Sequence, residues 1–353
     1  MCIRDSLKPN VGLVLLVISQ FFNSCMVVST KVLETEDVEA GEEPIKPLQI
    51  LLVRMLITYL GTLIYMYLNR ASIKNVPFGA PPMRKWLALR GFTGFFGVFG
   101  MYFSLLYLSI SDAVLITFLT PTVTVILAWV VLREKLTRLE VIGSIVSLAG
   151  VVLIVRPSFL FGILPTPEGS VESEDPRERL IATIVALVGV LGASAVYIII
   201  RFIGDKAHAI LSVSYFSLIV TIISFVGILV IPSMSFQVPK NLKQWLLFGN
   251  LGICGFIFQL LLTLGIQKER AGRGSLMSYT QLIYAVFWDV SLWHHWPSFW
   301  SWLGMFVILT TTVVVGKFKP RGDATAATRD QETQQVQADD DQVENIPLEE
   351  LSK

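Results

Sequence analysis

Charged side chains inside long apolar runs are the residues of this sequence best suited to bind a polar solute. Arg54 lies about two turns into the run PLQILLVRMLITYLG (residues 47–61), and Asp289 lies at a similar depth in a later run. A charge inside a bilayer costs roughly 2.5–3.5 kcal/mol on insertion scales, so such residues tend to be functional. The fork of Arg54 suits a phosphate or a carboxylate. The alternatives are a buried Arg54–Asp289 ion pair that fixes helix packing and an Arg54 that snorkels to the membrane surface.

A second arginine, Arg90, lies only four residues into the run 86–108, so we expect its side chain to snorkel. The same run carries a strip without side chains, which predicts close helix packing; a hinge is the alternative. The strip consists of Gly91, Gly94, Gly97 and Gly100.

A proline interrupts another run in the sequence Thr120-Pro121-Thr122. Proline removes one backbone donor and frees the carbonyl near Thr117, and Thr120, Thr122 and Thr124 can supply compensating hydrogen bonds. A break of this kind at the membrane midplane is where transporters bind substrate, and a kink that only improves packing is the alternative. Thr120 and Pro121 are therefore candidate binding residues.

Other polar residues within apolar runs are candidates to line a cavity, because lipid offers them no partner. Each can instead serve as a hydrogen bond between helices. They are Asn23, Tyr102, Tyr197, Tyr215, Asn250, Gln259, Tyr279 and Gln281.

The sequence contains none of the common catalytic or metal-binding patterns. G-x-S-x-G, a Walker loop, H-E-x-x-H and the basic stripe that nucleic acid requires are all missing. His208, His294 and His295 lack metal-ligand spacing, and Cys25 and Cys254 are typical of packed thiols. We therefore expect a protein that is not an enzyme, with no metal, no cofactor and no nucleic-acid partner.

The composition places these residues in a membrane. Hydrophobic residues make up 53% of the 353 residues, charged residues only 16%, and the mean hydropathy is +0.64. Apolar runs of roughly 20 residues recur, which is the length of a helix that crosses a bilayer, and none alternates with the period of a barrel strand. The sequence predicts ten transmembrane helices at 11–33, 48–68, 86–108, 112–132, 139–156, 180–200, 209–231, 244–266, 273–293 and 299–316.

The connections predict the orientation, because Lys and Arg collect on the cytoplasmic side. The connections that follow even-numbered helices hold twice as many Lys and Arg residues as those that follow odd-numbered helices. Two of the loops after odd-numbered helices are strongly acidic. Both termini are therefore expected in the cytoplasm. Residues 318–353 form an acidic tail that we expect to be disordered. Within the N-terminal segment 1–10, the opening MCIRDS reads like a translated sequencing-adapter sequence, so no function is assigned to residues 1–6.

The ten runs divide into two similar halves. The stretch from Ser111 to Gly143, moved forward by about 160 residues, falls on the region that ends at Gly304, and Tyr279-Thr280-Gln281 then matches the break at Pro121. Five spans per half require that the halves enter the membrane from opposite sides, which is an inverted repeat. We expect the halves at 11–156 and 180–317, joined by an acidic non-cytoplasmic loop at 157–179.

Several motifs resemble the EamA repeat of the drug/metabolite transporter superfamily. They are Asp112-Ala113, Thr120-Pro121, the run Arg133-Glu134-Lys135-Leu136-Thr137, Ile142-Gly143 and Gly150-Val151. Residues 47–61 and 90–113 resemble its eukaryotic solute-carrier-35 branch, particularly uncharacterised fungal members. The second half departs from the pattern, because His295 stands in the place of Glu134 and Trp296-Pro297 replaces Lys135-Leu136.

The resemblance implies an all-α membrane carrier that moves a small polar metabolite by alternating access. The solutes that would fit this branch are a nucleotide sugar, a sugar phosphate or an amino-acid-like solute, including anions of these classes. The same branch favours an endomembrane (ER, Golgi or vacuole) over the plasma membrane. A homodimer is left open. The alternative is a non-transporting membrane partner. Deletion of residues 321–353 would abolish a partner's function, whereas a carrier would survive it and fail with Arg54→Ala.

Overall fold

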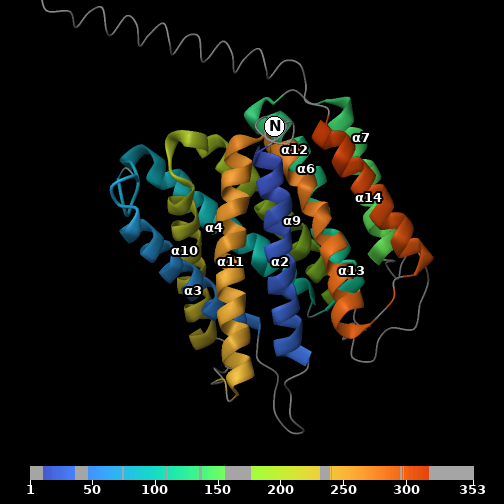
Figure 1. The fold of residues 1–353 in the computed structure, drawn as a ribbon, viewed down its shortest axis with the longest axis horizontal. Coiled ribbons are helices and arrows are strands. Elements are labelled where there is room, and N and C mark those ends of the chain that lie inside the picture. Colours follow the sequence, from blue (N-terminus) through green and yellow to red (C-terminus); the bar gives the residue numbers. More distant parts are fainter. Residues whose placement is uncertain are drawn as a thin grey trace, which may run out of the picture.

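A computed structural model of the chain describes residues 11–35, 47–73, 75–105, 107–108, 110–134, 137–155, 176–230, 239, 241–294, 296 and 298–317. Expectations for residues 1–10, for most of the 157–179 loop and for the 318–353 tail fall outside these residues. So do Lys135 and Leu136 of the repeat motif, and His295 and Pro297 of its second copy. The regular structure of the described part is helical throughout (Figure 1).

The first half of the chain supplies six of the helices. They are α2 (Val11–Thr35), α3 (Pro47–Leu68), α4 (Pro81–Leu105), α5 (Ile110–Thr117), α6 (Thr120–Leu132) and α7 (Arg138–Val155). The second half follows the same order. Its elements are α9 (Pro176–Ile203), η2 (Gly204–Lys206), α10 (Ala209–Val230), α11 (Leu242–Lys268), α12 (Ala271–Leu276), η3 (Met277–Tyr279), α13 (Thr280–Trp293) and α14 (Phe299–Lys317).

These helices match the ten apolar runs when α5 is counted with α6 and α12 with α13. Eight of the ten units in the described part are long and apolar enough to cross a membrane, and the other two are α4 and the α12–α13 unit. Large apolar side chains such as Trp129, Ile145 and Phe306 are more than half exposed on the outside of the bundle. A soluble protein does not expose apolar surface on this scale, so the bundle is built for lipid.

The packing of the helices follows the repeat. Helix α2 packs along α11, and its counterpart in the second half, α9, packs along α4; α3 packs on α10 and α7 on α14. In Figure 1, α2, α9 and α11 occupy the centre, with α3, α4 and α10 on one side and α6, α7, α13 and α14 on the other. The first helix of each half thus packs along the third helix of the other half, and the two second helices and the two fifth helices pack on each other, as an inverted repeat requires.

Small residues allow the closest of these contacts. A Cβ atom on Gly100 of α4 would lie 2.6 Å from the Cα atom of Gly189 on α9, and a Cβ atom on Gly304 of α14 would lie 2.6 Å from the carbonyl oxygen of Gly150 on α7. Backbones that approach this closely are typical of membrane helices. The close packing predicted for the glycine strip of α4 is thereby confirmed.

Candidate functional site

Two helices are interrupted where the sequence predicts polar breaks. Helix α5 ends at Thr117 and α6 begins at Thr120, while α12 passes into a 3-10 turn at Met277–Tyr279 before α13 begins at Thr280. Pro121 lies in the first turn of α6, where its missing N–H costs nothing. Both halves therefore carry a broken helix in the equivalent place.

The carbonyl group that Pro121 frees is satisfied by a hydroxyl group, and hydroxyl groups of the second half donate to two more carbonyls beside the break. Thr120 Oγ1 donates to the Thr117 carbonyl at 2.7 Å, as expected from the proline, and Ser194 of α9 donates to the Thr120 carbonyl at 3.1 Å. Ser275 of α12 donates to the Pro121 carbonyl at 3.3 Å. Neighbouring helices thus support the break, as a membrane environment demands.

The two breaks meet in the interior of the bundle. The hydroxyl groups of Thr122 and Tyr279 are 3.3 Å apart, and the Tyr279 ring stacks on Phe118 with centroids 6.0 Å apart. Tyr197 of α9 bonds Ser278 beside them at 2.7 Å. Tyr279 is fully buried and belongs to an apolar cluster with Leu262 and Ile266 of α11, so the interior is closed around the breaks.

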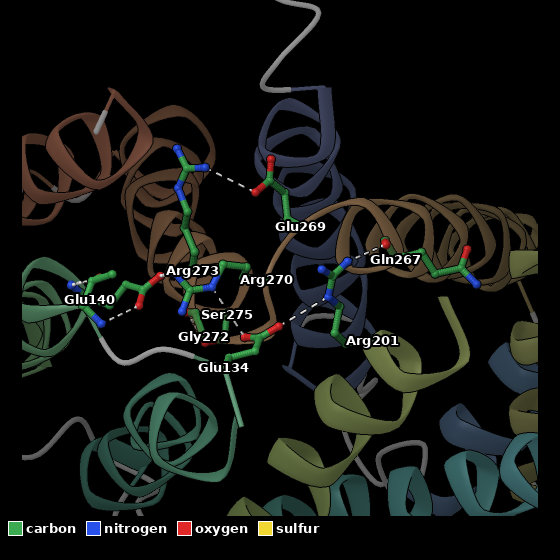
Figure 2. Close-up of polar contacts among 10 residues, drawn as sticks. Glu134, Glu140, Arg201, Gln267, Glu269, Arg270, Gly272, Arg273 and Ser275 are labelled. Carbon is green, nitrogen blue, oxygen red and sulfur yellow. Dashed lines mark hydrogen bonds and ion pairs between the residues drawn. The ribbon is translucent and has the colours of Figure 1, made fainter. Parts of the chain in front are cut away.

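Charged residues tie the two halves together at one end of the bundle, which we call the charged end: the end at which α6 and α9 finish and α7 and α12 begin (Figure 2). Glu134, just after α6, accepts from Arg201 Nε at 3.3 Å and lies 3.8 Å from Arg270 Nε. Arg270 Nη1 also lies 3.3 Å from Glu140 Oε1 on α7. Glu134 and Glu140 belong to the first half, whereas both arginines belong to the second.

Opposing electrostatic effects act on the pKa of Glu134. Burial raises the pKa of its carboxyl group above the ordinary value, and the positive charges of Arg201 and Arg270 together with an N–H from Ala271 oppose that rise. Glu134 therefore loses its proton at a higher pH than an exposed glutamate does.

The charged end has further anchors around these ion pairs. Arg273 is 2% exposed and uses all three of its nitrogen atoms: Nε donates to the Val315 carbonyl at 3.1 Å, Nη2 to the Gly316 carbonyl at 2.6 Å and Nη1 to Glu269 at 3.3 Å. It thereby satisfies carbonyl groups that the end of α14 leaves open. Thr137 and Glu140 bond each other's backbone N–H groups at the start of α7, which is a capping box.

The expectation that Arg90 snorkels is wrong. Its side chain is 1% exposed, and its Nη2 atom donates to Gln259 Oε1 of α11 at 2.8 Å. Its Cζ atom lies 4.1 Å from the ring centroid of Phe216 on α10. Arg90 faces α10 and α11, which enclose its side chain within the bundle.

Arg54 and Gln259 lie on the same side of the bundle. Arg54 is 9% exposed on α3 and contacts α11, because a Cβ atom on Gly255 would lie 3.2 Å from Arg54 Nε. Gly255 and Gln259 are four residues apart on α11 and so share one face. Two arginines from different helices therefore approach neighbouring turns of α11.

Other predicted residues lie apart from this group. Asn23 donates to Gln20 of its own helix at 3.3 Å, and Asn250 donates to Ser29 of α2 at 2.7 Å, which is the role of a link between helices. Tyr215 donates to the Phe78 carbonyl in the α3–α4 connection, so it lies near the charged end and not at the breaks.

The remaining predicted residues are only partly described. Gln281 is half-buried in the first turn of α13. The side chains of Tyr102 and Asp289 lie outside the described part of the chain, so the Arg54–Asp289 ion pair stays a prediction. Among described residues, no group of three His, Cys, Asp or Glu side chains is arranged to hold a metal ion.

Sequence reasoning missed the ion pairs of the charged end. It treated Arg201 and Arg270 as charges of the connecting loops, and Glu134 as part of a family motif. The spacing of Thr137 and Glu140, three residues apart before an apolar run, was a readable signal for the capping box. The pairing of Glu134 with residues far along the chain left no such signal.

Comparison with known proteins matches both halves of the chain to the same family. The sequence model of the EamA-like transporter family matches residues 10–156 and again residues 180–317. The chain is 66% identical over 328 residues to "Uncharacterized membrane protein YMR253C" of Saccharomyces cerevisiae. The aligned region covers 92% of this chain and 79% of the yeast protein. It is 62% identical over 317 residues to "Probable transport protein YPL264C" of the same yeast, covering 88% and 90%. The human "Solute carrier family 35 member G1" is 27% identical over 235 residues, covering 67% and 63%. The resemblance to the EamA repeat and to the solute-carrier-35 branch is thus confirmed.

Proposed function

The chain belongs to the EamA-like transporter family, and on that premise we propose that it moves a small polar metabolite across a membrane by alternating access. A nucleotide sugar, a sugar phosphate or an amino-acid-like solute is the substrate class that the solute-carrier-35 resemblance favours. The observation that carries the proposal is the contact of Thr122 with Tyr279, which brings one broken helix from each half together in the interior.

Broken helices suit this role for a physical reason. The ends of a broken helix present backbone groups and hydroxyl groups inside the membrane, where a polar solute would otherwise lose its hydrogen bonds. In the closed arrangement those groups bond one another, as Thr122 and Tyr279 do. A solute that enters between the halves replaces these bonds with its own.

The charged end supplies a closure on one side of this path. Glu134 and Glu140 of the first half hold Arg201 and Arg270 of the second, so separating the halves there breaks the ion pairs. Lys and Arg predominate at this end, which supports its placement in the cytoplasm with both termini. The choice of an endomembrane over the plasma membrane rests on the resemblance alone.

Labelling of a cysteine at the breaks tests the proposal without a known substrate. Thr122→Cys is placed in a chain whose Cys2, Cys25 and Cys254 are alanine, and the protein is reconstituted in vesicles of one orientation. A membrane-impermeant maleimide is then added to each side in turn. Alternating access predicts labelling from either side. Val130→Cys on the lipid-facing side of α6 is the matched control and stays unlabelled. Labelling of Thr122→Cys from one side only, or from neither, contradicts the proposal.

A further inference from the structure

Arg90 lies about as deep in the bundle as its partner Gln259. It is nine residues past the first residue of α4, and Gln259 is nine residues before the last residue of α11. At 1.5 Å of rise per residue, both lie roughly 13 Å from those ends of their helices. Arg90 is 1% exposed, so its guanidinium group does not reach the surface of the bundle.

The guanidinium group of Arg90 is incompletely satisfied. Nη2 donates to Gln259, but Nε and Nη1 have no hydrogen-bond partner among the described residues. Helices α4, α10 and α11, which surround it, contain no Asp or Glu in their sequences. A buried charge with open donors costs several kcal/mol unless something pairs with it.

Arg273 shows what a structural arginine looks like in this chain. Both side chains are almost fully buried, yet all three nitrogen atoms of Arg273 have acceptors, one of them a carboxylate. Arg90 has one neutral acceptor and the face of Phe216. The open donors of Arg90 therefore fit an oxygen-rich anion that is not part of the chain, because the oxygens of carboxylate and phosphate are strong acceptors for a guanidinium group.

We propose that Arg90 binds a carboxylate or phosphate group of the transported solute, with Gln259 and Phe216 positioning its guanidinium group. This inference rests on the proposed carrier function and gives its substrate class as an oxyanion. In the closed arrangement the amide oxygen of Gln259 occupies one donor. When the solute enters, its oxygens replace Gln259 at Nη2 and accept from Nε, whose N–H is parallel to one of the Nη2 N–H groups, and Arg54 adds a second positive charge on the same face of α11.

The site also adjoins the breaks. Gly94, one turn after Arg90, packs against the Phe216 ring and Val196 of α9, and Val196 belongs to the apolar cluster that holds Phe118 and Tyr279. Gln259 lies three residues before Leu262 of the same cluster. A solute held by Arg90 therefore lies beside the path that the two broken helices form.

Thermal unfolding of the purified full chain in detergent tests the inference. The probes are inorganic phosphate and glucose 6-phosphate, succinate and glutamate, with glucose as the neutral probe and putrescine as the cationic one. A ligand that binds only the folded state raises the unfolding midpoint. At least one anionic probe is expected to raise it by a few degrees, while glucose and putrescine leave it unchanged. Whether the phosphates or the carboxylates act identifies which oxyanion is bound. If no anionic probe shifts the midpoint, the inference is wrong.

Variants assign the shift to Arg90. Arg90→Met is expected to lose the anion-induced shift while its unliganded midpoint equals or exceeds that of the parent, because an unsatisfied buried charge is removed. Arg84→Met, in the exposed first turn of the same helix, keeps the shift. Gln259→Glu places a carboxylate beside Nη2, so it is expected to raise the unliganded midpoint and abolish the shift. A shift that survives in Arg90→Met, or in Gln259→Glu should Arg90→Met fail to fold, overturns the inference.

Failure of this inference is distinguishable from failure of the carrier proposal. Labelling of Thr122→Cys from either side does not depend on the identity of the solute. If that labelling is found and no anionic probe stabilises the chain, the carrier stands and only the oxyanion site falls. If the labelling is absent, the carrier proposal itself falls.

Discussion

Glu134 at the end of α6 and Arg201 at the end of α9 are 3.3 Å apart, and this ion pair joins the first half of the chain to the second. Both side chains are partly buried, so their attraction is stronger than that of an exposed ion pair. Removing the two charges from water costs part of this free energy. Because Arg270 approaches the same carboxylate, Glu134 is the centre of the closure at the charged end.

Glu134→Gln is predicted to loosen the charged end. The loss of its charge should favour opening by about 1–2 kcal/mol, which corresponds to roughly 5–30-fold in population. The measurement is the rate at which Thr122→Cys is labelled from the charged end. Glu178→Gln, at the opposite end of α9, is the matched control, and an equal change in both variants would argue against the gate.

Arg273→Ala is predicted to destabilise the folded chain by about 2–4 kcal/mol, because it leaves the Val315 and Gly316 carbonyl groups and Glu269 without their buried donor. The check is the free energy of unfolding in detergent. Arg138→Ala, at an exposed position on α7, should stay within about 0.5 kcal/mol of the parent. A small effect of Arg273→Ala would show that water replaces these bonds.

Gly100→Ala is predicted to destabilise the contact of α4 with α9 by about 1–3 kcal/mol. The added Cβ atom would meet the Gly189 Cα atom at 2.6 Å, and backbone on both sides cannot move aside without separating the helices. Gly249→Ala is the control, since nothing lies within 4 Å of its added Cβ atom. That control should be neutral or slightly stabilising through helix propensity. The measurement is the thermal unfolding midpoint of both variants in one detergent, and equal midpoints would contradict the prediction.

Much of the fold could be predicted because the bilayer imposes a length. Helix α10 was expected at 209–231 and is found at Ala209–Val230. The break at Pro121 was equally readable, since proline removes a donor wherever it lies. The start of α4 was placed five residues late, because Pro81 suits a first turn and Arg84 and Lys85 continue the helix beyond the apolar run.

The candidate site was less accessible to sequence reasoning. Arg90 was expected to reach the membrane surface because it lies close to the edge of the apolar run, but it faces α10 and α11, which enclose its side chain. Its partner Gln259 lies 169 residues along the chain, and periodicity within one helix says nothing of what faces it. Tyr215 was grouped with interior residues on polarity alone, although its hydroxyl group reaches the Phe78 carbonyl near the charged end.

The most direct test of alternating access locks the charged end shut. Glu134→Cys and Arg201→Cys are bridged with a short bis-maleimide, because two cysteine side chains are shorter than the glutamate and arginine that they replace. Thr122→Cys is introduced as the reporter. A low concentration of the bis-maleimide during bridging keeps the reporter unmodified. The account predicts that bridging stops labelling of Thr122→Cys from the charged end while labelling from the opposite side persists or increases. Continued labelling from the charged end of the bridged protein would contradict it.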